Sequence, residues 1–297
     1  MRTVLRTLYR DPRLPFLAVL FSYLVVGITF LGFNRTPAQV FITSLTACLL
    51  EVAFSLVFRR RWEWPLSALI TSIGLSILLN YSHDFTILAV PVFFAIGSKY
   101  LFTFRGRHAF NPAMAGVAFS LLFMEELISI SPAYQWYGLG HLVFFLFLPG
   151  LLLVLPGIRR FWLVGSFLVS YTLLTALRAW IMRYHLPFET LFWGTLSSPP
   201  FLLFAFFMIT DPRTSPDSPK EQVQVGVALA VVDLAFHLYQ SYFTFFYAAL
   251  TVASRRFERA MELATSLGTS AMPFEQREHR LHEFRSEEHT SELQSRL

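Results

Sequence analysis

Apolar residues in this chain come in stretches of about twenty, the length that an α-helix needs to cross a hydrocarbon core of about 30 Å. The apolar segments cover residues 14–33, 38–58, 64–81, 85–104, 110–130, 136–156, 161–181 and 186–209, followed by a longer stretch over 223–254. That last stretch is too long for one ordinary span, so we expect two helices with a turn near Tyr239-Gln240-Ser241. The pattern predicts an all-α polytopic membrane protein with about ten transmembrane helices.

The composition agrees with lipid as the surrounding solvent. Hydrophobic residues make up 55% of the chain and charged residues only 14%, whereas a soluble domain carries about a quarter charged residues. The single cysteine, Cys48, has no partner for a disulfide or a thiolate metal site. These numbers exclude an ordinary soluble enzyme and favour the lipid bilayer, not a nucleic acid, as the main partner.

Basic residues alternate between the connections as the positive-inside rule predicts for a cytoplasmic amino terminus. Residues 1–13 form a basic leader, and the later connections on the same side carry the clusters Arg59–Arg61, Lys99–Arg107, Arg159–Arg160, Arg213–Lys220 and Arg255–Arg259. The connection with Arg178 and Arg183 is the one exception. The pattern predicts a protein of the bacterial inner membrane.

The carboxyl end is expected to leave the membrane after residue 254. Residues 255–284 read as a cytoplasmic tail, and Ser254 to Leu267 have the spacing of a short amphipathic helix on the cytoplasmic surface. Residues 285–297 match the translation of a common sequencing adapter, so we treat them as an assembly scar.

One predicted span is interrupted near its middle. Ser197-Ser198-Pro199-Pro200 places two prolines inside the segment 186–209, where each removes a backbone donor. Broken helices at membrane depth often mark ligand sites, but a tolerated proline kink explains the sequence equally well.

Two polar stretches stand out at the ends of apolar segments. In the first, Asn111 before Pro112 is a helix-entry pattern, and the new helix would begin beside Arg107 and His108. Such a place attracts an anion, although a capped helix with ordinary basic neighbours is the simpler interpretation. In the second, Asp211 follows an apolar segment and either fixes a turn by side-chain to backbone hydrogen bonds or binds the hydroxyl groups of a ligand.

These same stretches carry a family resemblance. Phe110-Asn111-Pro112-Ala113-Met114-Ala115-Gly116 and Phe207-Met208-Ile209-Thr210-Asp211-Pro212-Arg213-Thr214-Ser215-Pro216 resemble the two signature stretches of the membrane subunits RnfD and NqrB. The resemblance extends over residues 14–254 and implies two related helical units with some broken helices. It also implies a subunit of an electron transport complex that moves electrons through flavins, couples this to ion transport, and works with other subunits and a quinone.

The resemblance further implies a flavin and the residues that would hold it. Members of this family carry an FMN joined to a threonine in a Ser-Gly-Ala-Thr sequence, which this chain lacks. We therefore expect a noncovalent FMN or riboflavin, and a divergent branch such as the RnfD-like proteins of enediyne-type biosynthetic clusters. The candidate site consists of the polar and flanking residues of both stretches: Arg107, His108, Phe110, Asn111, Pro112, Thr210, Asp211, Thr214 and Ser215.

Four ionisable residues, Glu51, His141, Asp233 and His237, fall inside apolar segments, where an unpaired ion costs at least about 2.5 kcal/mol. Asp233 and His237 are four residues apart and share one helix face, as a structural pair or a proton relay. Glu51 is either buried against another helix or an ion-site acid, and His141 reads as a lone polar residue at a helix start. A transporter or channel without a redox cofactor, or a membrane anchor for a partner, are the alternative functions.

Overall fold

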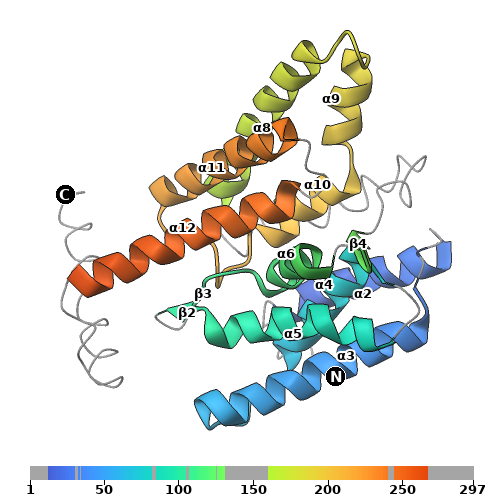
Figure 1. Ribbon diagram of the computed structural model, residues 1–297, viewed down its shortest axis with the longest axis vertical. Coiled ribbons are helices and arrows are strands. Elements are labelled where there is room, and N and C mark those ends of the chain that lie inside the picture. The colour runs from blue at the N-terminus through green and yellow to red at the C-terminus, as the bar shows by residue number, and fades with distance from the viewer. Residues whose placement is uncertain are drawn as a thin grey trace, which may run out of the picture.

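The computed structural model describes residues 13–30, 33, 35–81, 85–104, 107–124, 126–130, 160–239 and 244–266. The predicted span 136–156, including His141, lies outside these residues, as do the leader before residue 13 and the chain after residue 266. Within the described part, ten α-helices form two groups (Figure 1). This helical content confirms the all-α prediction.

The first group contains the helices that precede residue 125: α2 (Arg13–Phe30), α3 (Pro37–Phe54), α4 (Leu66–Leu78), α5 (Phe85–Leu101) and α6 (Pro112–Met124). The second contains those after residue 160: α8 (Phe161–Ile181), α9 (Phe188–Leu196), α10 (Pro199–Leu203), α11 (Pro219–Leu238) and α12 (Thr244–Ser266). Two π-helical turns, η1 (Ser55–Arg59) and η4 (Phe204–Met208), extend α3 and α10.

Not every apolar segment forms a helix of full membrane length. By length and composition, three helices in the described part can cross a membrane: Pro37–Arg59, Phe161–Tyr184 and Pro219–Leu238. A fourth span is possible if Phe188–Leu196 and Phe201–Met208, which are bent by 44° relative to each other, act together. The predicted interruption at Ser197-Ser198 is therefore present.

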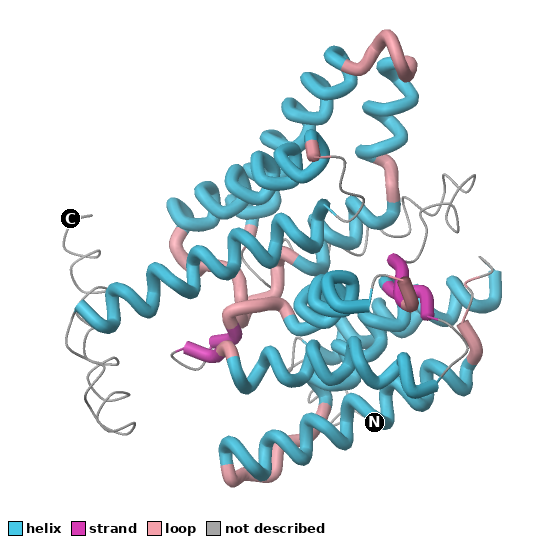
Figure 2. Tube along the Cα trace, in the orientation of Figure 1, coloured by secondary structure: helices cyan, strands magenta, loops and turns pink. Residues whose placement is uncertain are grey.

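The predicted spans 64–81 and 110–130 are shorter than expected, because each ends in a strand. Helices α4 and α6 have 13 residues each, and β1 (Leu79–Tyr81) then pairs antiparallel with β4 (Ile128–Ile130). A second small pair, β2 (Thr103–Phe104) with β3 (Arg107–His108), closes the connection between α5 and α6. The two small sheets lie at opposite ends of this helix group (Figure 2).

Glycines bring two helix pairs into close contact. A Cβ atom on Gly116 of α6 would lie 2.7 Å from the carbonyl oxygen of Pro91, inside α5. A Cβ atom on Gly226 of α11 would lie 2.8 Å from the carbonyl oxygen of Leu163 in α8. Small residues at such crossings allow the backbone approach on which helix association in lipid depends.

Aromatic rings form the core of the second group. The rings of Tyr171 and Phe201 stack with centroids 4.7 Å apart, and those of Phe204 and Phe245 stack at 4.8 Å. Phe167 packs against Phe201 and Phe204 as well. Helix α8, the broken α10–η4 segment and α12 are thereby joined.

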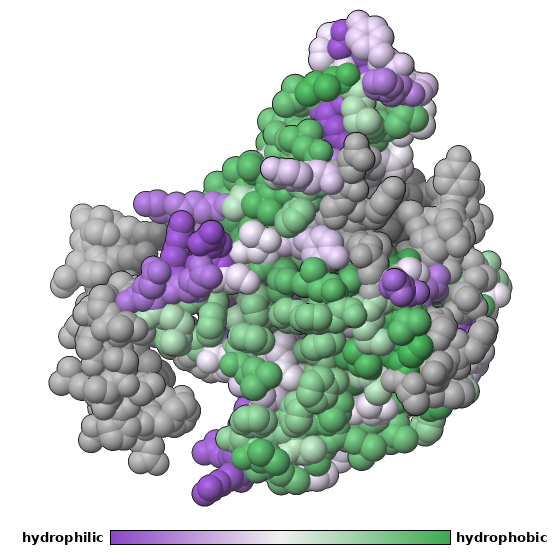
Figure 3. Space-filling view, viewed as in Figure 1, coloured by the Kyte–Doolittle hydropathy of each residue, from purple (hydrophilic) through white to green (hydrophobic). Residues whose placement is uncertain are grey.

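The surface agrees with a lipid environment. Apolar side chains cover most of the face in Figure 3, and hydrophilic ones gather at the ends of helices, including the carboxyl end of α12. Exposed large apolar side chains on the long helices include Phe41, Leu49, Val169, Leu173 and Trp180. In water such a surface would be an aggregation hazard.

The stretch 223–254 contains two helices as expected, since α11 ends at Leu238 and α12 begins at Thr244, while Gln240 and Ser241 of the predicted turn lie outside the described residues. Residues 254–266 are helical, as the amphipathic helix expected from Ser254 predicts, but they continue α12 instead of forming a short helix of their own. Helix α12 continues without a break to Ser266, because the segment has no proline or glycine that would end it before Gly268.

Candidate functional site

The first signature stretch begins a helix as the sequence predicts. The Oδ1 atom of Asn111 accepts a hydrogen bond of 3.3 Å from the backbone N–H of Met114, and Pro112 occupies the first position of α6. Asparagine at this position satisfies an amide that has no partner inside the helix. The Asn111 cap therefore fixes where α6 starts.

The second signature stretch forms a tight turn directly after η4. The Oδ1 atom of Asp211 accepts a hydrogen bond of 3.0 Å from the backbone N–H of Arg213, and the Asp211 carbonyl accepts one of 2.9 Å from the N–H of Ser215. Thr210 is buried, and its hydroxyl donates to the carbonyl of Phe206. This confirms the predicted side-chain to backbone bonding of the turn.

The two stretches, about one hundred residues apart in the sequence, meet at Asn111. Its Nδ2 atom lies 3.2 Å from the carbonyl oxygen of Met208 and 3.4 Å from Oδ2 of Asp211. One amide side chain thus caps α6 and holds the end of the η4 turn. The arrangement joins the first helix group to the second.

A cavity of about 350 Å³ opens beside this contact. Its polar side chains are Ser67 and Thr71 from α4 together with His108, Asn111, Thr210, Asp211 and Arg213. Apolar residues of α2, α4 and η4 form the other walls, among them Phe16, Leu20, Ile77, Leu78 and Phe207. Concave, mainly apolar sites of this size with a few polar groups are typical of small-molecule binding.

His108 contributes a buried ring to this cavity. His108 is 5% exposed, its Nε2 atom lies 3.5 Å from Nη1 of Arg213, and the backbone of Lys99 also interacts with the ring. Burial lowers the pKa of His108 to about 3, and the positive charges of Lys99 and Arg213 act in the same direction. The imidazole is therefore neutral at physiological pH.

Asp211 is the acid of the same cavity. Burial raises the pKa of its carboxyl group, although the N–H and the charge of Arg213 oppose this effect. A carboxyl group with a raised pKa, in the same cavity as a neutral imidazole, can hold or release a proton there.

Three arginines hold the rest of the turn. Arg107, from β3, donates to the carbonyls of Pro212 and Ser215 and pairs with Asp217. Arg160, just before α8, donates to Oγ of Ser215 at 2.7 Å and pairs with Asp217 at 2.6 Å. Arg256, in α12, donates to the carbonyl of Thr214 at 2.8 Å. These contacts form a clamp around the turn.

The clamp also affects the charge of Asp217. Partial burial alone would raise the pKa of this carboxyl group, but the hydrogen bonds and charges of Arg107 and Arg160 outweigh burial and keep the pKa below its usual value. The basic side chains beside α6 were predicted to attract an anion. In the structure, Arg107 binds the carboxylate of Asp217 and backbone carbonyls of the turn instead.

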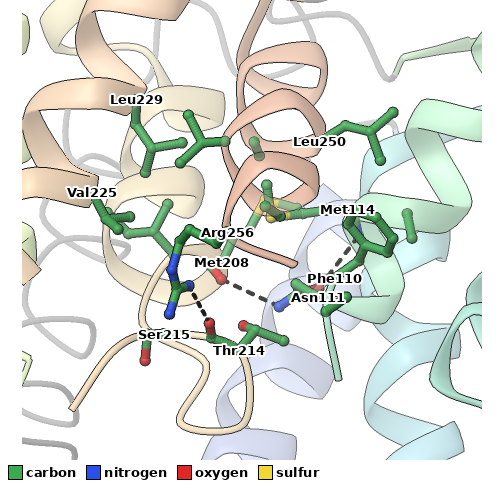
Figure 4. A pocket seen from close by; sticks show the side chains of 16 residues that line it. Phe110, Asn111, Met114, Met208, Thr214, Ser215, Val225, Leu229, Leu250 and Arg256 are labelled. Carbon is green, nitrogen blue, oxygen red and sulfur yellow. Dashed lines mark hydrogen bonds between the residues drawn. The ribbon is translucent and has the colours of Figure 1, made fainter. Parts of the chain in front are cut away.

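A second, smaller cavity of about 60 Å³ also borders Asn111 (Figure 4). Phe110, Thr214 and Ser215 line it, with apolar residues of α11 and α12 and the guanidinium group of Arg256. The predicted site residues are thus divided. His108, Pro112, Thr210 and Asp211 face the larger cavity, Phe110, Thr214 and Ser215 the smaller one, and Asn111 both.

The structure adds one residue that sequence reasoning assigned differently. Lys99 was expected among the cytoplasmic loop charges, but it lies in the last turn of α5 and its side chain is 1% exposed. Its Nζ atom lies 3.0 Å from Oε2 of Glu51 and 3.0 Å from Oγ of Ser67. Glu51 is therefore buried against another helix in an ion pair. The signal that could have identified Lys99 was its position within the apolar segment 85–104.

Asp233 and His237 pair within α11, as their spacing predicts. Nδ1 of His237 lies 3.1 Å from Oδ2 of Asp233, and the aspartate side chain is 4% exposed. Oδ1 of Asp233 has no hydrogen-bond partner among the described residues. Neither residue lines the two cavities described above.

The comparison with protein families decides the assignment. A model described as the NQR2, RnfD, RnfE family matches residues 13–137 and again residues 134–252. The chain belongs to this family. The double match agrees with two related helical units, and both signature stretches lie inside the matched residues. No curated protein matches the chain.

Membership in the NQR2, RnfD, RnfE family fixes the general role. Proteins of this family are membrane subunits of electron transport complexes. Together with the apolar helices, this makes the chain a multi-pass membrane protein and a subunit of a multi-subunit complex.

Proposed function

We propose that this chain binds a noncovalent flavin, FMN or riboflavin, in the larger cavity and passes electrons through it, coupled to ion movement across the membrane. The observation that carries the proposal is the meeting of both signature stretches at one cavity, through Asn111, Met208 and Asp211. The partners would be other subunits of the complex and a quinone, and the membrane would be the bacterial inner membrane with the amino terminus in the cytoplasm.

The residues of the cavity fit a flavin. Its ring system has apolar faces and a polar edge, and the cavity combines apolar walls with the polar side chains of His108, Asn111 and Asp211. When bound, a flavin supplies electron transfer, while these residues orient the ring, exclude water and hold protons at the Asp211 carboxyl group.

A cofactor-free transporter remains the second candidate, because one observation favours it. Helix α9 and the segment Phe201–Met208 of α10 and η4 are bent by 44° relative to each other, and broken helices bind substrates or ions in many transporters. A membrane anchor would need neither a cavity nor a broken helix. The presence or absence of a chromophore separates these candidates from the flavin subunit.

The test is an absorbance and fluorescence spectrum of detergent-purified protein before and after acid precipitation. We expect a flavin spectrum that leaves with the supernatant. A flavin that stays in the pellet would contradict noncovalent binding, and folded protein without any flavin would contradict the proposed function.

Substitution then locates the site. Asn111→Ala and Asp211→Ala should each lower the flavin content severalfold without preventing membrane insertion. Thr36→Ala is the matched control for Asn111, because Thr36 caps α3 in the same way but does not line the cavity. Both cap losses should destabilise the protein by about 1 kcal/mol, so a flavin loss common to both would reflect stability and not the site.

A further inference from the structure

The buried ion pair of Glu51 and Lys99 joins three helices of the first group. Glu51 extends from α3 and Lys99 from α5, while Ser67 of α4 accepts a hydrogen bond from the lysine. The hydroxyl of Tyr100 also donates to the carbonyl of Glu51 at 3.2 Å. A cation at this depth is costly unless it is paired, so its neighbours hold it in a defined place.

The lysine end of the pair lies next to a wall of the larger cavity. Ser67, the hydrogen-bond partner of the ammonium group, lines that cavity. Lys99 also interacts electrostatically with Asp211 and Arg213, which are lining residues as well. Through Ser67, the positive charge of the pair therefore lies just behind the cavity wall.

We propose that Lys99 is a positioning residue whose charge, held by Glu51 and Ser67, raises the reduction potential of the redox group in the larger cavity. This inference rests on the proposed function. Two electrons from a reduced carrier in a partner subunit, and one proton from water, convert a neutral oxidised flavin into a monoanion. A cation close to the ring favours that negative form over the neutral one.

The experiment measures the midpoint potential of the bound flavin spectroscopically, in detergent, for the wild type, Lys99→Met and Lys99→Arg. Lys99→Met should lower the affinity for the reduced flavin relative to the oxidised one about tenfold, a downward shift of about 30 mV for a two-electron couple. Lys99→Arg keeps the positive charge and should restore most of the potential.

Two serines of α4 provide a milder pair of variants in case the lysine variants do not fold. Ser67→Ala removes the hydroxyl that holds the ammonium group and should shift the potential in the same direction as Lys99→Met. Ser72→Ala is its control, because Ser72 is buried and bonds to Ser44 at 3.0 Å but does not line the cavity. Ser72→Ala should leave the potential unchanged.

The outcomes separate this inference from the proposed function. Flavin in the wild type with an unchanged potential in folded Lys99→Met, or in both serine variants, would overturn the inference alone. Equal shifts in Ser67→Ala and Ser72→Ala would also overturn it, because they would indicate a general change of packing. A wild type without flavin would overturn the proposed function and the inference with it.

Discussion

The two acid–base pairs inside the helices are built differently. Glu51 and Lys99 are separated by 48 residues and join α3 to α5 beside a cavity. Asp233 and His237 are four residues apart on α11 and face neither described cavity. The first pair depends on the tertiary fold, whereas the second follows from helix geometry alone. Its place beside the cavity therefore makes the first pair the better candidate for a role in function.

The largest difference should appear when one partner of the first pair is removed. Lys99→Met leaves the Glu51 carboxylate buried without its cation, which typically costs about 3–5 kcal/mol. The measurement is thermal unfolding in detergent, with Glu51→Gln/Lys99→Met as the control. The double variant should recover much of the loss, and equal losses in both proteins would contradict a coupled pair.

An intermediate effect on the free energy of unfolding should come from pH, through His108 in the larger cavity. The unfolded chain takes up a proton on histidine near pH 6.5, whereas folded His108, with its pKa lowered by burial to about 3, does not. Protons therefore favour unfolding, and the stability present above pH 6.5 is lost as the pH falls toward 3, by up to about 1.4 kcal/mol per pH unit.

The variant His108→Gln should flatten this pH dependence in thermal unfolding curves recorded above and below pH 6.5. His185 is the matched control, because it is exposed in the turn after α8, and His185→Gln should leave the slope unchanged. A wild-type slope that persists in His108→Gln would show that other groups cause it.

The smallest effect should follow substitution in the second pair. Asp233→Asn keeps the size of the side chain and removes the charge, and hydrogen bonds between groups inside a membrane contribute about 0.6 kcal/mol on average. We expect a loss of this order in thermal unfolding and no change in flavin content. A loss as large as that of Lys99→Met would remove the contrast between the two pairs.

Local features were accessible to sequence reasoning because they depend on neighbouring residues. The Asn111 cap, the Asp211 turn, the Asp233–His237 spacing and the break at Ser197 all follow from helix geometry and proline chemistry. The division of the stretch 223–254 into α11 and α12 was predictable because the stretch is too long for a single span.

The features that sequence reasoning missed are tertiary or depend on secondary-structure type. Lys99 resembled a loop charge until the fold placed Glu51 and Ser67 beside it. Residues 79–81 and 128–130 continue apolar segments, and hydropathy alone does not separate a short strand from the end of a helix. The pairing of Arg160 with Asp217 likewise depends on how the turn folds back.

The contact between Gly116 and Pro91 has a consequence for how far the polar groups of the cavity lie from Lys99. Pro91 lies two helical turns before Lys99 on α5, and Gly116 lies five residues after Asn111 on α6. Sliding either helix by one residue would bring a side chain onto a carbonyl where only hydrogen fits. The contact therefore fixes the position of α6 along α5. It thereby sets the distance between Asn111 and Lys99, that is, between the polar groups of the cavity and the buried charge behind its wall.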